Sequence, residues 1–303
     1  MRGISATTPG DGEVTRSSSA PDMMRRYYPS CRHVLLLSLL LFPAVQFAVF
    51  AIVGGYSERI GLLTGELTTV WVVFLSIRIN KWIAEDLLLV NATRLSVLFG
   101  AAVAGVGGCL VIADLDLLFE RLISSYGLAP PLALQRASLE LQVVGGLSEV
   151  PLALAAIVVA PAVCEEAIFR GFLLTSLVVR LGPKIGLAIS ALIFAAVHVN
   201  PWQFPALLLF GLFLGLLTWW THSIYPAILA HGINNLLSLV GTNTLTYTGV
   251  DAPLATDEYL PLPILAVALV CLWLGLTLVR RRDPLVAFAP LLQRTAAIMR
   301  SQV

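Results

Sequence analysis

Residues 150–178 read VPLALAAIVVAPAVCEEAIFRGFLLTSLV, and the only charged residues among them are Glu165, Glu166 and Arg170. A helix needs roughly 20 predominantly apolar residues to cross a bilayer, and this stretch supplies more than that. A charged side chain at the centre of a membrane helix costs about 2.5–3.5 kcal/mol, so such residues usually have a function. The stretch therefore predicts a membrane helix that contains part of a polar site.

The composition of the whole chain is also that of a membrane protein. Hydrophobic residues make up 58% of the 303 residues, charged residues make up 12%, and the mean hydropathy is +0.87. Soluble proteins contain roughly 25% charged residues, so this chain has too few charges to cover a surface that faces water. The net charge of +1 argues against nucleic acid as a partner. The four cysteines form no CxxC pair, and we expect them to be buried apolar side chains.

Several apolar segments predict an all-α fold, a polytopic bundle of about eight membrane-spanning helices. The expected spans are 34–54, 60–77, 95–113, 150–178, 185–199, 203–220, 224–241 and 262–279. Residues 82–93 look amphipathic and are expected to lie along the membrane interface. Residues 114–149 are expected to form the longest loop. Residues 1–30 are rich in Ser, Thr, Gly, Pro and Arg, and we expect them to form a disordered cytoplasmic tail.

The basic residues predict how the bundle is oriented, because Lys and Arg concentrate on the cytoplasmic side of membrane proteins. If eight spans alternate from a cytoplasmic N-terminus, only Arg59, Arg121 and Arg136 of the 19 basic residues lie outside. Both termini are therefore predicted to be cytoplasmic. The alanine- and leucine-rich helices favour a bacterial cytoplasmic membrane. His222 falls in a short cytoplasmic turn, where we expect it to be solvated.

The first polar segment divides its charges between two faces of the helix. Glu166 and Arg170 are four residues apart, so they share a face and are expected to pair, which lowers the cost of burying both. Glu165 points about 100° away and lacks that partner. A carboxylate without a partner is available to act as a general base. If all three residues only paired with one another, they would serve to lock helices together.

The next segment supplies an imidazole at a matching depth. Glu165 lies 17 residues before Gly182, near the expected turn, and His198 lies 16 residues after it. In an antiparallel helical hairpin, residues equidistant from the turn lie at the same depth, so these two side chains are expected to face each other. Phe194 is one turn from His198 and is expected to form a wall of the site.

The seventh segment adds His231 and Asn235, which are four residues apart and share a face. Together with the glutamates and His198, they suit hydrolysis of a peptide bond by an activated water, with donors for the oxyanion. Intramembrane Glu and His residues also form proton relays, so a transporter or proton-coupled carrier is an alternative. A non-catalytic immunity or scaffold protein of the same fold is another.

The order Glu-Glu-x-x-x-Arg, Phe-x-x-x-His and His-x-x-x-Asn resembles the CAAX-protease and bacteriocin-processing family of intramembrane endopeptidases, which includes the type II CAAX prenyl endopeptidases. The residues that carry the resemblance are Glu165, Glu166, Arg170, Phe194, His198, His231 and Asn235. The resemblance implies a catalytic core at residues 146–245, after N-terminal membrane helices and a loop at 31–145. Residues 246–303 would form the last membrane helix and a basic cytoplasmic tail. The implied partners are the lipid bilayer and a membrane-associated protein or peptide substrate.

The resemblance also implies a role for each motif. Glu165 with His198 would activate water, and His231 with Asn235 would stabilise the oxyanion. The neighbouring Glu–Arg pair would position its helix, and the motif phenylalanine would contact substrate. Members are often named metalloproteases, and Glu165, His198 and His231 would supply a two-His, one-Glu set for zinc. There is no His-Glu-x-x-His, so a mechanism without metal or other cofactor is favoured.

Depth adds one further expectation. At ~1.5 Å per residue, His231 lies about 12 Å from its cytoplasmic turn, whereas Glu165 lies about 25 Å from the turn of its hairpin. These groups meet only if the hairpin projects into the cytoplasm, so we expect the site to open there. Glu66 is the one other carboxylate at depth, and both a substrate-path role and a helix-pairing role are open to it. Gly211 and Gly215 form a Gly-x-x-x-Gly pattern, typical of helix packing.

Overall fold

The computed structural model describes residues 28–247 and 259–280, and all the regular elements in these two ranges are helices. The all-α fold is therefore confirmed. The elements of the N-terminal half are α2 (Cys31–Leu36), η1 (Leu37–Leu41), α3 (Phe42–Val53), α4 (Glu58–Asn80), α5 (Ala84–Leu88), α6 (Leu95–Ser124) and α7 (Leu132–Gln142). Those of the C-terminal half are η2 (Leu147–Glu149), α8 (Val150–Ala153), η3 (Leu154–Val159), α9 (Ala160–Glu166), η4 (Ala167–Leu174), α10 (Thr175–Leu181), α11 (Pro183–Val197), α12 (Phe204–Thr221), α13 (Tyr225–Tyr247) and α14 (Leu262–Arg280).

Six helices within the described residues are long and apolar enough to cross a membrane, which confirms a polytopic membrane bundle. They are Cys31–Val53, Glu58–Asn80, Leu95–Ser124, Leu147–Leu181, Phe204–Thr221 and Leu262–Arg280. Helix α11 is apolar but has only 15 residues, and α13 is long but is not among the six. The predicted count of eight spans is therefore not confirmed. The two predicted cytoplasmic tails lie mostly outside the described residues.

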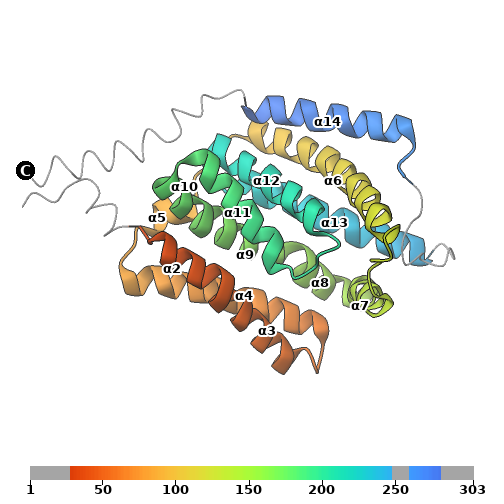
Figure 1. Cartoon of the computed structure of the whole chain (residues 1–303), viewed down its shortest axis with the longest axis horizontal. Coiled ribbons are helices and arrows are strands. Elements are labelled where there is room, and N and C mark those ends of the chain that lie inside the picture. The colour runs from red at the N-terminus through yellow and green to blue at the C-terminus, as the bar shows by residue number, and fades with distance from the viewer. Residues whose placement is uncertain (1–27, 248–258, 281–303) are drawn as a thin grey trace, which may run out of the picture.

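The helices follow one another across the bundle, as Figure 1 shows. Helices α3 and α4 pack together on one side, and α4 packs against α9 in the long rod that runs from η2 to α10. Helix α11 returns along this rod and packs against α12, which is followed by α13. Helices α6 and α14 pack together on the opposite side of the bundle. The rod that carries Glu165 and Glu166 thus lies in the interior of the bundle.

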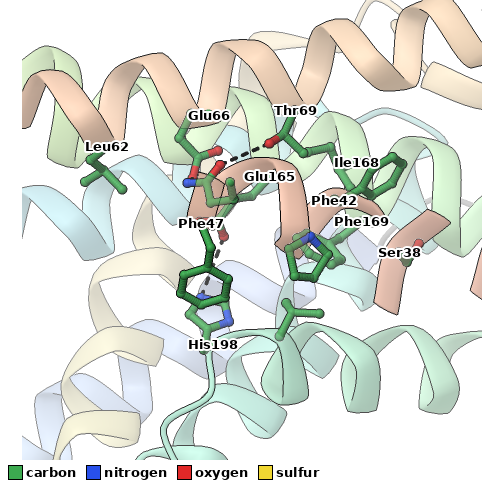
Figure 2. A pocket seen from close by; sticks show the side chains of 13 residues that line it. Ser38, Phe42, Phe47, Leu62, Glu66, Thr69, Glu165, Ile168, Phe169 and His198 are labelled. Atoms are coloured by element: carbon green, nitrogen blue, oxygen red, sulfur yellow. Dashed lines mark hydrogen bonds and ion pairs between the residues drawn. The ribbon is translucent and has the colours of Figure 1, made fainter. Parts of the chain in front are cut away.

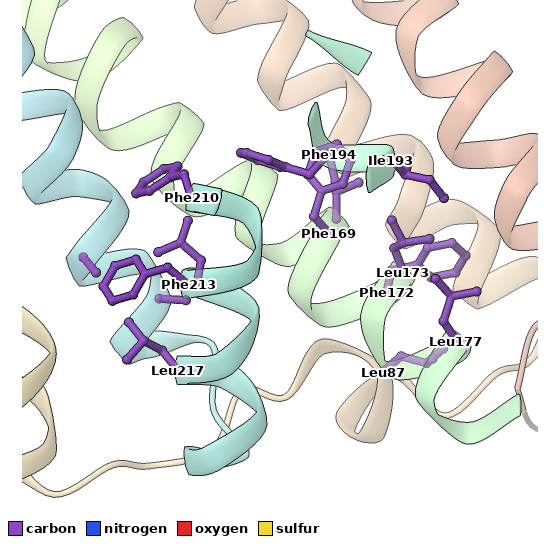
Figure 3. Close-up of a cluster of buried hydrophobic side chains, with 14 of the residues drawn as sticks. Leu87, Phe169, Phe172, Leu173, Leu177, Ile193, Phe194, Phe210, Phe213 and Leu217 are labelled. Atoms are coloured by element: carbon purple, nitrogen blue, oxygen red, sulfur yellow. The ribbon is translucent and has the colours of Figure 1, made fainter. Parts of the chain in front are cut away.

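The hydrophobic core lies where the rod, α11 and α12 meet, and Figure 3 shows its aromatic and leucine side chains. Residues that are at most 1% exposed come from all three elements: Phe172, Leu173 and Leu177, Phe194, Leu214 and Leu217. The two glycines of the Gly-x-x-x-Gly pattern make the close approach of α12 to α11 possible. A Cβ on Gly211 would lie 3.2 Å from Phe194 Cδ1, and one on Gly215 would overlap Leu187 Cδ1.

The expected loop at residues 114–149 is wrong in large part. Helix α6 continues to Ser124, and α7 occupies 11 of the remaining residues. The helical pattern runs past Asp114 and Asp116 because apolar residues follow both of them, among them Leu115 and Leu118. The charges of Asp114 and Asp116, which closely follow the predicted span, therefore do not mark the end of α6.

The segment at residues 82–93 and the turn at His222 are also more buried than expected. Leu87 is fully buried in the core, and the Asp86 carboxylate accepts a hydrogen bond from the Tyr28 hydroxyl at 2.9 Å. The same segment covers the turn between α12 and α13, where Asn91 Nδ2 donates to the His222 carbonyl at 2.8 Å. His222 is consequently only 8% exposed and is not a solvated side chain.

Candidate active site

Glu165 and His198 form the first of two polar clusters. Glu165 lies near the end of α9, and His198 directly follows α11; the Glu165 Oε2 and His198 Nε2 atoms are 3.9 Å apart. The side chains are 16% and 29% exposed, so both are accessible from the same space. Oε2 of Glu165 is buried and has no hydrogen-bond partner among the described residues. The helical hairpin therefore brings together two residues that lie at nearly equal distances from Gly182.

The ring of His198 has a defined orientation. Its Nδ1 lies 2.7 Å from the carbonyl oxygen of Phe194, one helical turn earlier. A carbonyl only accepts hydrogen bonds, so Nδ1 carries the proton. In the neutral imidazole, Nε2 is then an acceptor, and it faces Glu165. A gap of 3.9 Å between two acceptors is suited to a water molecule that donates to both.

Glu166, Arg170 and His231 form the second cluster. Oε1 of Glu166 accepts from Arg170 Nη1 at 2.9 Å, and His231 Nδ1 lies 2.8 Å from the same oxygen. The exposed fractions of the three side chains are 0%, 1% and 5%, so the cluster is fully inside the bundle. The pairing of Glu166 with Arg170 follows the spacing of the sequence. The contact with His231 was not predicted, since it depends on how α13 is rotated against α9.

Phe194 separates the two clusters. Its ring centroid lies 4.7 Å from that of His198 and 6.4 Å from that of His231. The Arg170 guanidinium lies 4.2 Å above the same ring, within the range of a cation–π contact. Phe194 is only 1% exposed, so the structure places it in the core between the clusters, and it does not line the pocket beside Glu165 and His198.

A pocket of about 220 Å³ opens beside Glu165 and His198 (Figure 2). One wall comes from the rod and α11 and includes Glu165, Phe169 and His198. The other wall comes from the N-terminal helices, in which the sequence shows no motif. Its polar lining residues are Ser38, Gln46, Glu66 and Thr69. Of these, only Glu66 could have been found from the sequence, as a carboxylate within an apolar segment.

Asn235 lies one turn beyond His231 on α13 and is partly buried. Its Oδ1 accepts a hydrogen bond from Asn234 Nδ2 at 3.1 Å, and the residue is not in the lining of the pocket beside Glu165. Its expected contribution to an oxyanion site therefore stays a prediction.

The three residues considered for zinc do not converge on one point. Among the described residues, no group of three or more His, Cys, Asp or Glu side chains is placed to share a metal ion. Glu165 faces His198, whereas Nδ1 of His231 is occupied by Glu166. The donors present thus do not fit a two-His, one-Glu zinc site, and no catalytic step is derived through a metal.

These features define a class: a polytopic helical membrane protein with a partly exposed glutamate–histidine pair next to a pocket. The comparisons with known proteins narrow this class. The family model described as Type II CAAX prenyl endopeptidase Rce1-like matches residues 147–237, so the chain carries an Rce1-like region that contains all seven motif residues. The match confirms the family resemblance. Since that family is one of proteases, it supports a peptidase with a membrane-associated peptide substrate. No curated protein and no solved structure matches the chain.

Proposed function

We propose that this protein is an intramembrane endopeptidase that hydrolyses a peptide bond of a membrane-associated protein or peptide. The observation that carries the proposal is the position of Glu165 opposite His198, at the edge of a pocket inside a membrane bundle. The match of residues 147–237 to a family of proteases supports the reaction type.

Glu165 and His198 activate the water in this mechanism. The water donates one hydrogen bond to Glu165 Oε2 and one to His198 Nε2. Glu165 takes a proton as the water oxygen attacks the carbonyl carbon of the substrate. The same proton then passes to the nitrogen of the leaving amine as the C–N bond breaks, which regenerates the carboxylate. General base catalysis of this kind contributes typically 10²–10⁴-fold to a rate.

In this mechanism the second cluster helps to stabilise the oxyanion that forms on the substrate carbonyl. His231 donates through Nδ1 to Glu166, and in its protonated form it has a further donor at Nε2. Arg170 holds Glu166 in place, so the hydrogen bond to Glu166 fixes the orientation of the His231 ring. We assign His231 Nε2, with Asn235 on the same face of α13, to the developing oxyanion.

The test is a proteomic comparison of membranes that contain either the wild-type chain or the Glu165→Gln variant. A membrane-protein fragment that appears only with the wild type supports the proposal and identifies a substrate. Identical fragment profiles in the two membranes would remove it. The mechanism uses no metal, so a chelator is expected to leave cleavage unchanged; chelator inactivation that zinc reverses would contradict this part.

A further inference from the structure

Glu66 presents a carboxylate to the pocket that the proposed mechanism does not use. It lies on α4, is 6% exposed, and its Oε1 accepts from Gln46 Nε2 at 3.1 Å. The Thr69 hydroxyl donates a hydrogen bond to Gln46 Oε1 at 3.0 Å. The other carboxylate oxygen of Glu66 makes no hydrogen bond within the described residues. Figure 2 shows Glu66 and Thr69 extending from one helix toward Glu165 and His198.

The charges around the pocket are unbalanced. Glu66 and Glu165 both line it, and its lining contains no Lys or Arg. The buried Arg170 is already paired with Glu166. An uncompensated carboxylate in a poorly solvated place is costly, and two carboxylates facing one small space repel each other. A positive group that enters the pocket would relieve both costs.

The size and the walls of the pocket indicate what kind of positive group fits. Its volume of about 220 Å³ is below the roughly 300–1,000 Å³ of pockets that hold whole small molecules. One amino-acid side chain is the better match. The remaining lining is mostly apolar, including Phe42, Phe47, Leu62 and Ile168. Lys and Arg have apolar stems that pack on such walls and a charged end that needs a partner.

We infer that Glu66 is a specificity-determining residue, and that the pocket receives a basic side chain of the substrate next to the scissile bond. The inference rests on the proposed function, because it places the bond at Glu165 and His198. In this arrangement the stem lies along the apolar walls from the N-terminal helices, and the cationic end reaches Glu66. The region that matches the family thus contains the catalytic residues, and the N-terminal helices contain the residue that selects the substrate.

The experiment compares fluorogenic transmembrane peptides that differ at one position, with the full-length protein in proteoliposomes. Lys or Met is placed directly before or directly after the cleaved bond, since the two side chains are similar in length but only Lys is charged. For one of these two positions, we expect kcat/KM to be at least about tenfold higher with Lys than with Met. In Glu66→Gln this ratio should fall toward one, because the amide keeps an acceptor for Gln46 but has no charge.

Glu140→Gln is the matched control, since Glu140 is an exposed carboxylate on α7 outside the pocket, and its ratio should equal that of the wild type. Equal cleavage of Lys and Met peptides by the wild type, or an unchanged ratio in Glu66→Gln, would overturn the inference while leaving the proposed function intact. Cleavage that persists in Glu165→Gln would instead refute the proposed function. A wild-type protein that cleaves none of the peptides would count against both.

Discussion

A single carboxylate oxygen of Glu166 links three helical segments. It accepts from Arg170 on η4 and contacts His231 on α13, while Glu166 itself ends α9. A buried ion pair contributes little net stability compared with apolar residues, but removal of one partner costs about 3–5 kcal/mol because a buried charge is left uncompensated. The contacts of this oxygen therefore determine both the stability of the fold and the orientation of His231.

The Glu166→Gln variant is expected to be much less stable than the wild type, because it leaves the Arg170 charge buried without its counter-ion. The expected loss is about 3–5 kcal/mol, seen as a lower melting temperature of the purified protein in detergent. The double variant Glu166→Gln/Arg170→Gln should lose less than the sum of the two single variants, since neither charge remains. Additive losses, or a wild-type melting temperature for Glu166→Gln, would show that the pair does not interact as described.

The residue contacts that were predictable from the sequence are those that helical geometry sets. Glu166 and Arg170 meet because they are four residues apart, and Glu165 meets His198 because the two residues are almost equally far from one turn. The contact of Glu166 with His231 depends on the rotation of α13, which no local pattern in the sequence fixes. The hydrogen bonds of Gln46 to Glu66 and Thr69 join two helices outside the motif region, so they too required the structure.

At the scale of elements, small residues determine how closely α14 approaches α6. A Cβ on Gly275 would lie 2.7 Å from Ala104 Cα and would overlap the backbone nitrogen of the same residue. A Cβ on Gly100 would lie 2.8 Å from Leu278 Cβ. Such contacts are found between membrane helices, where packing rather than burial from water drives association.

The Gly275→Ala variant is expected to separate α14 from α6 and to lower the melting temperature in detergent, since the added methyl group meets backbone atoms that have no room to move. Overpacking of this kind typically costs about 1–3 kcal/mol. Gly241→Ala is the control, because Gly241 lies within α13 and nothing is found within 4 Å of its added Cβ. Gly241→Ala should be neutral or slightly stabilising. Equal effects of the two substitutions would refute the close crossing.

The burial of His222 in the turn between α12 and α13 predicts that the stability of the protein depends on pH. Burial lowers the pKa of His222 from 6.5 to about 4. Between these values the unfolded chain binds more protons than the folded chain, so the stability due to this residue is complete above about pH 6.5 and is lost as the pH falls toward 4. His222→Asn does not titrate there and tolerates the left-handed backbone at this position, where φ is 54°.

Melting temperatures of the wild type and of His222→Asn, measured in detergent from pH 7.5 to pH 4, therefore separate this contribution from those of other groups. The wild type should lose more stability than the variant on acidification. Parallel pH profiles for the two proteins would show that His222 is accessible to water in the folded state.

The ends of elements were less predictable than their existence. Helical segments occur at all eight predicted spans, yet α6 runs well beyond its predicted end to Ser124. The segment around Asn91 was assigned to the interface, but it covers His222 through hydrogen bonds to backbone groups. The extension of α6 follows from the apolar residues beyond Asp114 and Asp116, whereas the burial of His222 depends on polar contacts between segments far apart in sequence.

At the scale of the whole molecule, the orientation of the bundle stays a prediction that rests on the distribution of basic residues. Reporter fusions at residues 20 and 295 should both report the cytoplasm. Reporters on opposite sides would require an odd number of spans, so that only one of α11 and α13 would cross the membrane in addition to the six apolar helices. The same experiment decides whether the hairpin of Lys184 faces the cytoplasm.

Two different parts of the chain form the walls of the pocket. Residues 147–237 match the family of proteases and carry both polar clusters, while the pocket beside them is completed by helices that precede this region. The motif residues were recognisable because their spacing repeats a known pattern. The second wall of the pocket was not, because its residues are brought to the site only by the packing of α3 and α4 against the rod.

The central claim is that Glu165 and His198 activate a water for peptide-bond hydrolysis, and cleavage kinetics test it most directly. Purified wild type, Glu165→Gln and His198→Ala are compared on a fluorogenic transmembrane peptide, with melting temperatures to confirm that each variant is folded. The account predicts a loss of at least about 10²-fold in kcat for Glu165→Gln, and a comparable loss for His198→Ala, in folded protein. Wild-type turnover by both variants would contradict it.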